Sequence, residues 1–287
     1  MVNMAYKIVV DSSSDIPRDI SSEIGILTVP MPVYIDGNTY QEGVDIFTDS
    51  FYSNFKNYRD LPKTSQPNPI LLKDTYEKIL AEGKDVIAIH LSSGLSSTYQ
   101  SAVMVREMCS SPERIHIIDS LGASLGFGLQ AILPKRLSTE QDNTSEIVDQ
   151  ITKLRDNMRY IFTIDTLEYL VRGGRASKTA GFVAGLLDVK PILHFNPEGK
   201  IEVFGKVRSR KAAIRKLVDI IEQDIIEPEK QIIGISHAAC LEEAIALAEG
   251  IRSRIKVKDI MMGEIGCVIG SHVGPGTLAL FYQAGSR

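Results

Sequence analysis

The 287-residue sequence contains no tryptophan and only three cysteines. Cys109, Cys240 and Cys267 are widely separated and include no CxxC pair, so we expect reduced, packed thiols rather than a disulfide framework. His237 stands near Cys240, but two such residues are too few for a zinc site. We therefore predict no bound metal, and this cysteine usage is typical of a cytoplasmic protein.

Long apolar runs are absent as well. The N-terminal stretch MVNMAYKIVVDSSSD becomes polar after a few apolar positions, which is too soon for a signal peptide. No later run approaches the about 18 consecutive apolar residues that a membrane-spanning helix needs. We expect a cytoplasmic chain that does not insert stably into a membrane.

An excess of charge of one sign is also missing. The formal net charge is -4, and acidic and basic residues are spread along the chain. Such a chain offers no basic face for phosphate backbones, so nucleic acid is not an expected partner. The length and the 44% hydrophobic content predict two packed domains, which we place at residues 1–160 and 161–287.

Signatures of nucleotide-binding and hydrolytic enzymes are incomplete. Residues 173–179, GGRASKT, lack the second glycine of a Walker A loop, and residues 94–98 and 234–238 lack the final glycine of a nucleophile elbow. Residues 126–131 fit the letters of a dinucleotide fingerprint, but they begin seven residues after the preceding strand ends at Asp119. We predict neither a cofactor nor a catalytic residue.

The first half of the chain alternates short apolar runs with helical patterns. The runs lie at residues 7–11, 27–34, 85–91 and 115–119, and the helical patterns at residues 69–83, 97–109 and 124–137. Strands buried on both faces predict a parallel sheet with helices on each side, an α/β/α domain. Ligands of such sheets bind where strands end and helices begin.

The second half has a different pattern. It predicts strands at residues 159–165, 231–236, 257–263 and 277–282, and helices at residues 166–171, 177–187, 211–226 and 241–253. Residues 191–207 read as a hairpin that turns at Asn196-Pro197-Glu198-Gly199. A mixed sheet with a hairpin predicts a second domain of the α+β class.

Four polar stretches stand out, at residues 11–15, 63–67, 90–102 and 270–276. The third follows an apolar run and carries seven hydroxyl groups, on Ser92, Ser93, Ser96, Ser97, Thr98, Tyr99 and Ser101. Ser96 alone could be an ordinary helix N-cap, but a cap needs only one hydroxyl. Helix N-terminal amides beside many hydroxyls instead form a site for a carboxylate or phosphate that needs no fixed positive charge.

His272 and two basic clusters are further candidates. His272 lies among three glycines and a proline, which predicts a rigid turn that approaches a ligand, although a lone histidine is often structural. The clusters contain Arg172 and Arg175, and then Arg208, Arg210 and Lys211. They suit either an anionic ligand or an acidic partner protein, while a helix C-terminus with solvated charges is the simpler interpretation of the first.

These stretches in combination resemble the DegV family. The resemblance rests on Val10-Asp11-Ser12, Thr64-Ser65-Gln66-Pro67, residues 92–102, Arg172-Gly173-Gly174-Arg175, Lys206-Val207-Arg208, and His272 with Gly274-Pro275-Gly276, in this order across nearly the whole chain. Two positions depart from the family pattern, because Ser97 stands where glycine is frequent and Ser209 where threonine is frequent.

The resemblance implies a two-domain fatty-acid-binding protein rather than an enzyme. Thr64 and Ser96 would bond the carboxylate and His272 would lie nearby. The acyl tail would lie between the domains. Arg175 and Arg208 would dock a partner kinase, which supplies ATP and converts the bound fatty acid to an acyl phosphate. The full predicted ligand site is Thr64, Ser65, Ser93, Ser96, Ser97 and His272, and the predicted docking residues are Arg172, Arg175, Arg208, Arg210 and Lys211.

Two alternatives stay open at this point. A serine acyl hydrolase would use Ser96 as nucleophile and His272 as base, with Asp11 or Asp119 orienting the histidine. A sugar- or triose-binding kinase subunit would share the same general architecture.

Overall fold

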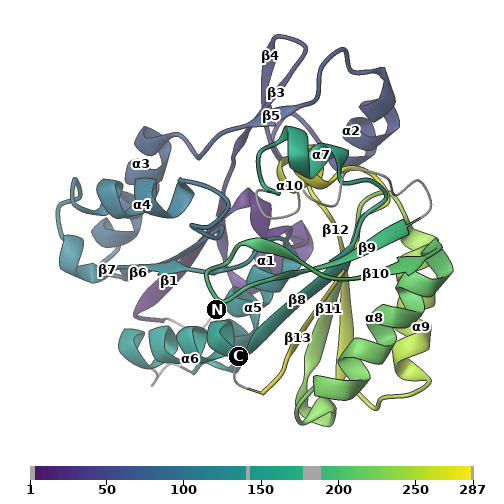
Figure 1. Cartoon of the computed structure of the whole chain (residues 1–287). Coiled ribbons are helices and arrows are strands. Elements are labelled where there is room, and N and C mark those ends of the chain that lie inside the picture. Colours follow the sequence, from purple (N-terminus) through teal and green to yellow (C-terminus); the bar gives the residue numbers. More distant parts are fainter. Residues whose placement is uncertain (1–3, 140–142, 177–188, 286–287) are drawn as a thin grey trace.

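Three β-sheets form the framework of the described parts of the chain in the computed structural model, which describes residues 4–139, 143–176 and 189–285 (Figure 1). The first sheet is parallel and has the order β2-β1-β6-β7. Its strands are β1 (Tyr6–Asp11), β2 (Leu27–Val29), β6 (Asp85–His90) and β7 (Ile115–Asp119). Helices α3 (Pro69–Ala81) and α4 (Thr98–Arg106) cover one face. The other face packs on α1 (Arg18–Ile24), α5 (Leu125–Leu137) and α6 (Thr144–Asn157), which confirms the predicted α/β/α arrangement.

The single strand predicted at residues 27–34 is wrong, because the chain leaves the parallel sheet at Pro30. Proline has no N–H for a ladder, and the N–H of Met31 bonds the hydroxyl of Ser12 at 3.1 Å rather than a strand. The chain then enters a small antiparallel sheet of order β4-β3-β5, made by β3 (Pro32–Ile35), β4 (Asn38–Gln41) and β5 (Lys63–Thr64). Helix α2 (Thr48–Asn54) and the 3-10 turn η2 (Phe55–Asn57) connect β4 to β5.

The largest sheet has six strands in the order β10-β9-β8-β13-β11-β12. They are β8 (Met158–Thr163), β9 (Val189–Phe195), β10 (Ile201–Arg208), β11 (Ile232–His237), β12 (Asp259–Glu264) and β13 (Leu278–Gln283). Only the β11–β12 pair is parallel, so the predicted mixed sheet and its hairpin are confirmed. Helices α8 (Arg210–Asp224) and α9 (Leu241–Arg252) cover the outer face. The helix predicted at residues 177–187 lies outside the described residues.

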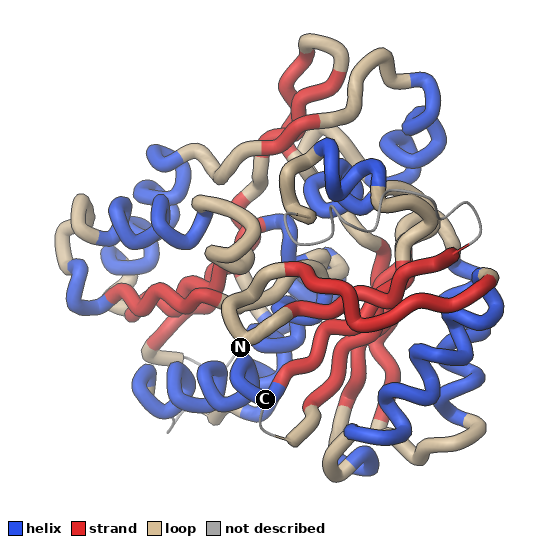
Figure 2. The backbone as a smooth tube through the Cα atoms, viewed as in Figure 1, coloured by secondary structure: helices blue, strands red, loops and turns tan. Residues whose placement is uncertain are grey.

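Helix α5 lies between the two large sheets and contacts strands of both, so the sheets share one hydrophobic core. The close approach depends on Gly126, where an added Cβ would lie 2.3 Å from the Tyr160 ring and 2.6 Å from the Phe281 ring. Figure 2 shows the sheets side by side, with the β9–β10 hairpin reaching from the mixed sheet toward the parallel one. Between the two sheets, at the N-terminal end of α5, lies a space that we call the seam.

Two short helices line one side of this seam. They are α7 (Glu168–Arg172) and α10 (Cys267–Val273), which contact each other. The turn predicted around His272 is wrong in its geometry, because His272 lies in the last turn of α10. The helix ends at Gly274, whose positive φ of 72° terminates it and is readily adopted only by glycine.

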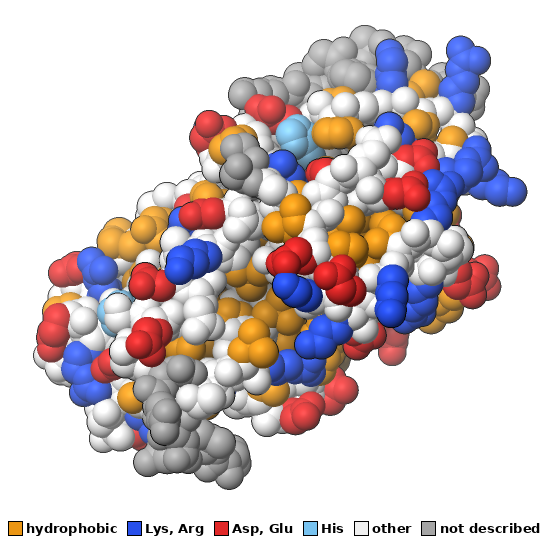
Figure 3. All heavy atoms as spheres, turned by 90° about the horizontal axis from the view of Figure 1, so that it is seen from below, with side chains coloured by type: hydrophobic (Ala, Val, Ile, Leu, Met, Phe, Trp, Pro, Cys, Tyr) orange, Lys and Arg blue, Asp and Glu red, His pale blue; other side chains and the backbone are white. Residues whose placement is uncertain are grey.

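The remaining described elements are 3-10 turns, η1 (Ser12–Ser14), η3 (Pro112–Arg114) and η5 (Pro228–Lys230). Within the described ranges, every helix is too short or too polar to cross a bilayer. On the face seen from below, acidic and basic side chains are interspersed around a central area of hydrophobic side chains (Figure 3). That face therefore presents no uniformly positive surface.

Candidate ligand-binding site

A cavity of about 740 Å³ lies in the seam between the large sheets. This volume is within the range of small-molecule sites. The carboxyl edge of the parallel sheet, the small sheet, the inner face of the mixed sheet and α10 all contribute to its wall. The cavity therefore lies beyond the carboxyl ends of the parallel strands, where ligands of α/β sheets are expected to bind. The mixed sheet forms its other side.

Much of the cavity wall is apolar. The aliphatic and phenylalanine side chains in its lining are Met31, Leu91, Leu95, Ala123, Phe162, Leu170, Phe195, Ile201, Ile265, Val268, Ile269, Val273, Ala279 and Phe281. Phe162, Phe195 and Phe281 come from neighbouring strands of the mixed sheet, and Tyr160 supports them from behind, with its ring centroid 5.0 Å from that of Phe195 and 5.5 Å from that of Phe281. These walls suit a hydrocarbon and offer it few hydrogen-bonding groups.

Polar side chains gather at another part of the wall. Five predicted ligand residues line the cavity there, namely Thr64, Ser65, Ser96, Ser97 and His272. They come from β5 and the loop after it, from the turn between β6 and α4, and from α10. Ser93, the sixth, does not line the cavity, and its N–H instead donates to Asp119 Oδ1 at 3.1 Å.

His272 pairs with Thr64, because its Nε2 lies 2.8 Å from Thr64 Oγ1. Burial and the nearby positive charge of Arg175 lower the pKa of His272 to about 4. The ring is therefore neutral at neutral pH. Its Nδ1 is buried and has no hydrogen-bond partner among the described residues. A neutral histidine can share a proton with the threonine hydroxyl without adding charge to the site.

Arg175, predicted as a docking residue, brings a formal positive charge to the cavity wall. Its Nε donates to the carbonyl of Leu95 at 3.1 Å and its Nη1 to the carbonyl of Gly173 at 2.6 Å. The side chain lines the cavity, and no carboxylate in the described part of the chain forms an ion pair with it. The hydroxyl-rich wall therefore lies beside a fixed positive charge, which the hydroxyl cluster alone did not predict.

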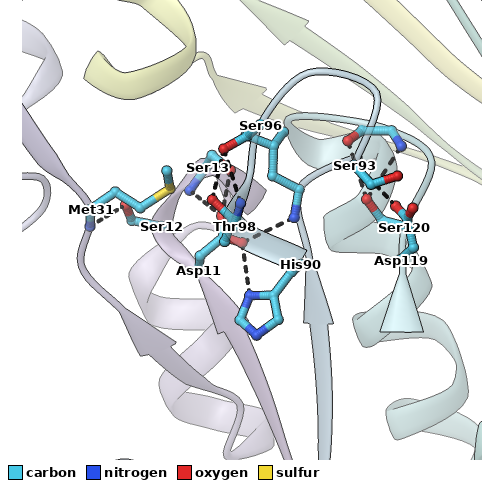
Figure 4. Close-up of polar contacts among 12 residues, drawn as sticks. Asp11, Ser12, Ser13, Met31, His90, Ser93, Ser96, Thr98, Asp119 and Ser120 are labelled. Atoms are coloured by element: carbon cyan, nitrogen blue, oxygen red, sulfur yellow. Dashed lines mark hydrogen bonds and ion pairs between the residues drawn. The ribbon is translucent and has the colours of Figure 1, made fainter. Parts of the chain in front are cut away.

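A buried network fixes the base of the β6–α4 turn (Figure 4). Asp11 Oδ2 accepts the N–H of Leu91 at 3.0 Å and lies 3.0 Å from His90 Nδ1, while Oδ1 accepts from the N–H and the hydroxyl of Ser13. His90 Nε2 lies 3.0 Å from the hydroxyl of Tyr76. Asp11 and His90 have no exposed surface, so this network acts from beneath the turn rather than on a ligand.

The contacts of Ser96 do not match those of a serine hydrolase. Its Oγ lies 2.8 Å from Thr98 Oγ1 and accepts the N–H of Thr98 at 3.3 Å. His272 bonds Thr64 instead, and the two acids considered for orienting it bond elsewhere, Asp11 to His90 and Asp119 to backbone N–H groups. The nucleophile–base–acid arrangement that acyl transfer needs is not assembled among these residues.

Two carboxyl groups that contact residues of the cavity lining, on the buried Glu42 and the half-buried Asp15, were not among the predicted site residues. Glu42 Oε1 accepts the N–H of Val268 at 2.8 Å, and Oε2 accepts the hydroxyl of Ser12 at 2.5 Å. Asp15 Oδ2 accepts the hydroxyl of Ser124 at 2.5 Å. Burial, followed by the charge of Glu42, raises the pKa of Asp15 well above its usual value, and burial also raises the pKa of Glu42. No group of three or more His, Cys, Asp or Glu side chains in the described ranges is arranged to hold a metal ion.

The predicted docking residues have different surroundings. Arg172 is exposed and pairs with Glu168 at 3.0 Å. Arg210 is mostly buried, with 17% of its side chain exposed, and pairs with Glu243 at 2.6 Å. Arg208 and Lys211 are exposed at the junction of β10 and α8, and Arg175 lies in the cavity wall. Only part of the predicted cluster is therefore free to meet a partner surface.

Comparisons with known proteins agree over nearly the whole chain. A family model described as an uncharacterised protein of the DegV family matches residues 5–285. A DegV domain-containing protein of Caldanaerobacter subterraneus subsp. tengcongensis is 37% identical over 276 residues, which cover 96% of this chain and 98% of the relative. A fatty-acid-binding DegV family protein of Thermus thermophilus matches with a TM-score of 0.90 and 29% identity, over 98% of this chain and 100% of the relative. DegV of Bacillus subtilis, described as a fatty acid binding protein, matches with a TM-score of 0.87 and 32% identity, over 98% and 100%.

Proposed function

The chain belongs to the DegV family, and we propose that it binds one long-chain fatty acid in the cavity between its two large sheets. The observation that carries this proposal is a cavity whose wall is mostly apolar and bears a group of polar side chains at one part. The fatty-acid-binding relatives of Thermus thermophilus and Bacillus subtilis support the same class of ligand. We keep the division into domains 1–160 and 161–287 as part of the proposal.

The tail supplies most of the binding free energy. Transfer of one methylene from water contributes about 0.8 kcal/mol, so a dozen methylenes contribute on the order of 10 kcal/mol before the cost of ordering the ligand. The phenylalanine rings and aliphatic side chains of both sheets offer the necessary apolar surface. Affinity for a free fatty acid therefore depends mainly on filling the interior.

The head determines the orientation of the ligand. An unpaired carboxylate in an apolar cavity costs several kcal/mol, so the carboxylate lies where donors are available. We place it against the hydroxyls of Thr64 and Ser96, with the guanidinium of Arg175 close enough to offset its charge. Ser65, Ser97 and the neutral His272 complete the polar wall.

We further propose that a separate ATP-dependent kinase phosphorylates the bound carboxylate to an acyl phosphate. Hydroxyl donors can rotate to accommodate the added phosphoryl group, and the chain lacks a Walker A loop of its own. Exposed Arg208 and Lys211 are the best candidates for meeting that kinase. In this proposal the chain is a lipid-binding subunit of the cytoplasm and performs no chemistry itself.

Lipid extraction tests the binding proposal directly. We expect denaturing extraction of the purified protein, followed by mass spectrometry, to release about one long-chain fatty acid per chain, and the delipidated protein to bind oleate or palmitate. Ala279→Phe should reduce this binding because Ala279 lines the cavity, whereas Ala246→Phe on the exposed face of α9 should not. A lipid-free protein that takes up neither fatty acid would exclude the proposal.

A further inference from the structure

The tip of the β9–β10 hairpin contacts the β6–α4 turn across the seam between the sheets (Figure 1). The hydroxyl of Ser92 donates to the carbonyl of Gly199 at 2.8 Å and accepts the N–H of Gly94 at 3.1 Å. Ser92 has no exposed surface. One buried side chain thus joins the head-binding turn of the first lobe to the hairpin of the second.

The two backbones fit so closely that neither glycine can carry a side chain. An added Cβ at Gly94 would lie 2.7 Å from the carbonyl oxygens of both Glu198 and Gly199. An added Cβ at Gly199 would lie 2.1 Å from Ser92 Oγ and 3.0 Å from the Cα of Leu121. The atoms that would clash at Gly94 belong to the backbone, so rotation of a side chain cannot relieve the overlap.

Hydrogen bonds within the hairpin fix the conformation of its tip independently of the contact with the β6–α4 turn. Asn196 Oδ1 accepts the N–H of Glu198 at 3.1 Å and that of Lys200 at 2.9 Å, and the N–H of Gly199 donates to the carbonyl of Asn196 at 2.9 Å. Phe195 and Ile201, which pair across the hairpin next to this tip, both line the cavity. The hairpin therefore forms part of the apolar wall and ends in a preorganised contact with the turn.

The same turn carries the polar end of the site. Ser96 and Ser97 line the cavity only a few residues after Ser92, and the carbonyl of Leu95 holds the guanidinium of Arg175. Any movement of the hairpin tip away from Gly94 would release this turn on its buried side. The contact thus lies between the wall that holds the tail and the donors that hold the carboxylate.

We propose that the tip of the β9–β10 hairpin positions the β6–α4 turn, which carries the proposed carboxylate donors, through Ser92, Gly94 and Gly199. The apolar wall that contacts the acyl tail and the groups that bind the carboxylate are then fixed relative to each other. This inference rests on the proposed fatty-acid function. Ser92, Gly94 and Gly199 are positioning residues, because they act on the ligand through Ser96 and Arg175 and do not line the cavity themselves. By fixing the position of Ser96 and Arg175, they allow the bonds to the carboxylate to contribute to the affinity for the fatty acid.

The test compares palmitate with 1-hexadecanol, which has the same chain length and no carboxylate. We expect Gly94→Ala to weaken palmitate binding about tenfold and hexadecanol binding much less, as for the loss of a hydrogen bond to a charged group. Ser92→Ala should change the ratio in the same direction by a smaller factor. The matched control is Gly205→Ala on β10, where an added Cβ meets nothing within 4 Å.

Hydrogen exchange of the ligand-free variants separates this inference from the proposed function. We expect faster exchange at residues 92–98 and at the hairpin tip in Gly94→Ala than in Gly205→Ala. If Gly94→Ala fails to fold, Ser92→Ala gives the same comparison.

A palmitate-to-hexadecanol ratio and an exchange pattern equal to those of the control would overturn the inference. A wild-type protein that binds neither lipid would overturn the function, and the exchange data alone would then decide whether the tip holds the turn.

Discussion

At the scale of single residues, two hydroxyls carry the proposed contact with the carboxylate. Thr64 comes from β5 and Ser96 from the turn before α4, and both line the cavity. We expect Thr64→Val and Ser96→Ala each to weaken fatty-acid binding by about 1 kcal/mol, roughly fivefold, because each removes one hydrogen bond to the ligand. Displacement of a fluorescent fatty acid measures both changes.

Ser93→Ala is the matched control for this prediction. Ser93 lies in the same turn as Ser96, but it does not line the cavity, and its hydrogen bond to Asp119 is donated by its backbone N–H. We expect its substitution to leave binding unchanged. Equal effects of Ser93→Ala and Ser96→Ala would show that the turn, rather than the individual hydroxyl, determines affinity.

His272 gives a prediction about pH. Its pKa is about 4 in the folded protein, against 6.5 for an unperturbed histidine. Between these values the unfolded chain binds a proton that the folded chain does not, so the free energy of unfolding falls as the pH falls from 6.5 to 4. We expect His272→Gln to reduce this loss by about 2 kcal/mol in urea denaturation of the lipid-free protein.

His116→Gln on β7, outside the cavity lining, provides the control for replacing a histidine by glutamine away from the ligand site. If His272→Gln and the wild type lose the same free energy of unfolding between pH 7 and pH 4.5, the histidine is not held neutral by burial.

At the scale of elements, the sequence predicts the strands and helices that have a local cause. The run at β6 is apolar on both faces and is followed at once by hydroxyl residues, so both the strand and its functional turn can be predicted. The break at Pro30 and the small sheet cannot, because they depend on Met31 bonding Ser12, a contact between distant segments. The small sheet carries Thr64, so its position near His272 follows only from the tertiary structure.

The same distinction applies to the candidate site. The hydroxyl cluster and His272 stand out in the sequence by their composition and spacing. Glu42 does not, because an isolated acid is ordinary at a protein surface until folding buries it, and nothing in the sequence shows that Arg175, predicted to dock a partner, lies in the cavity wall. Ser93 is the reverse case, since it belongs to the hydroxyl cluster in the sequence but does not line the cavity.

Glu42 gives a prediction that belongs to the contact between elements. It follows β4, accepts the N–H of Val268 in α10, and lies near Asp15 and Asp11. Its pKa is raised in the folded state, so the folded protein keeps a proton that the unfolded chain loses above pH 4.5. The free energy of unfolding therefore falls as pH rises from 4.5 through the raised pKa.

Glu42→Gln removes this titration while it keeps an oxygen for Val268 and a polar partner for Ser12. We expect the free energy of unfolding to decline less between pH 5 and pH 8 in the variant than in the wild type, as urea denaturation can measure. Asp15 still titrates in the variant, so part of the decline should persist. Parallel curves for the two proteins would contradict the assignment of a raised pKa to Glu42.

At the scale of the whole molecule, the exposed charges bear on the proposed kinase. Arg208 is exposed beside Lys211 and has no carboxylate partner among the described ion pairs. We expect Arg208→Glu to leave fatty-acid binding unchanged and to slow the phosphorylation of bound fatty acid at low salt, because charge at a rim mainly affects association rates. Arg136→Glu, at the far end of α5 from the cavity, makes the same charge change and should have no effect on the rate.

The dimensions of the cavity lead to the last prediction, because both sheets line it and its volume is about 740 Å³. Each added methylene should raise affinity by about 0.8 kcal/mol, or about fourfold, while apolar wall remains to be covered. Once the cavity is full, further methylenes must displace packed side chains or stay in water, so affinity should stop rising. A series of saturated fatty acids tested by competition should therefore show a rise and then a plateau.

The chain length at which affinity stops rising can be used to identify the part of the cavity wall that limits the ligand. Ala279 lines the cavity beside Phe281, and Ala279→Phe adds a ring there, so the plateau should move to shorter chains. The exposed Ala246→Phe adds the same ring outside the cavity and should leave the plateau in place. If the slope below the plateau is the same in all three proteins and only Ala279→Phe moves the limit, the space between the sheets sets the length of the ligand. A limit that does not move would place the tail elsewhere in the molecule.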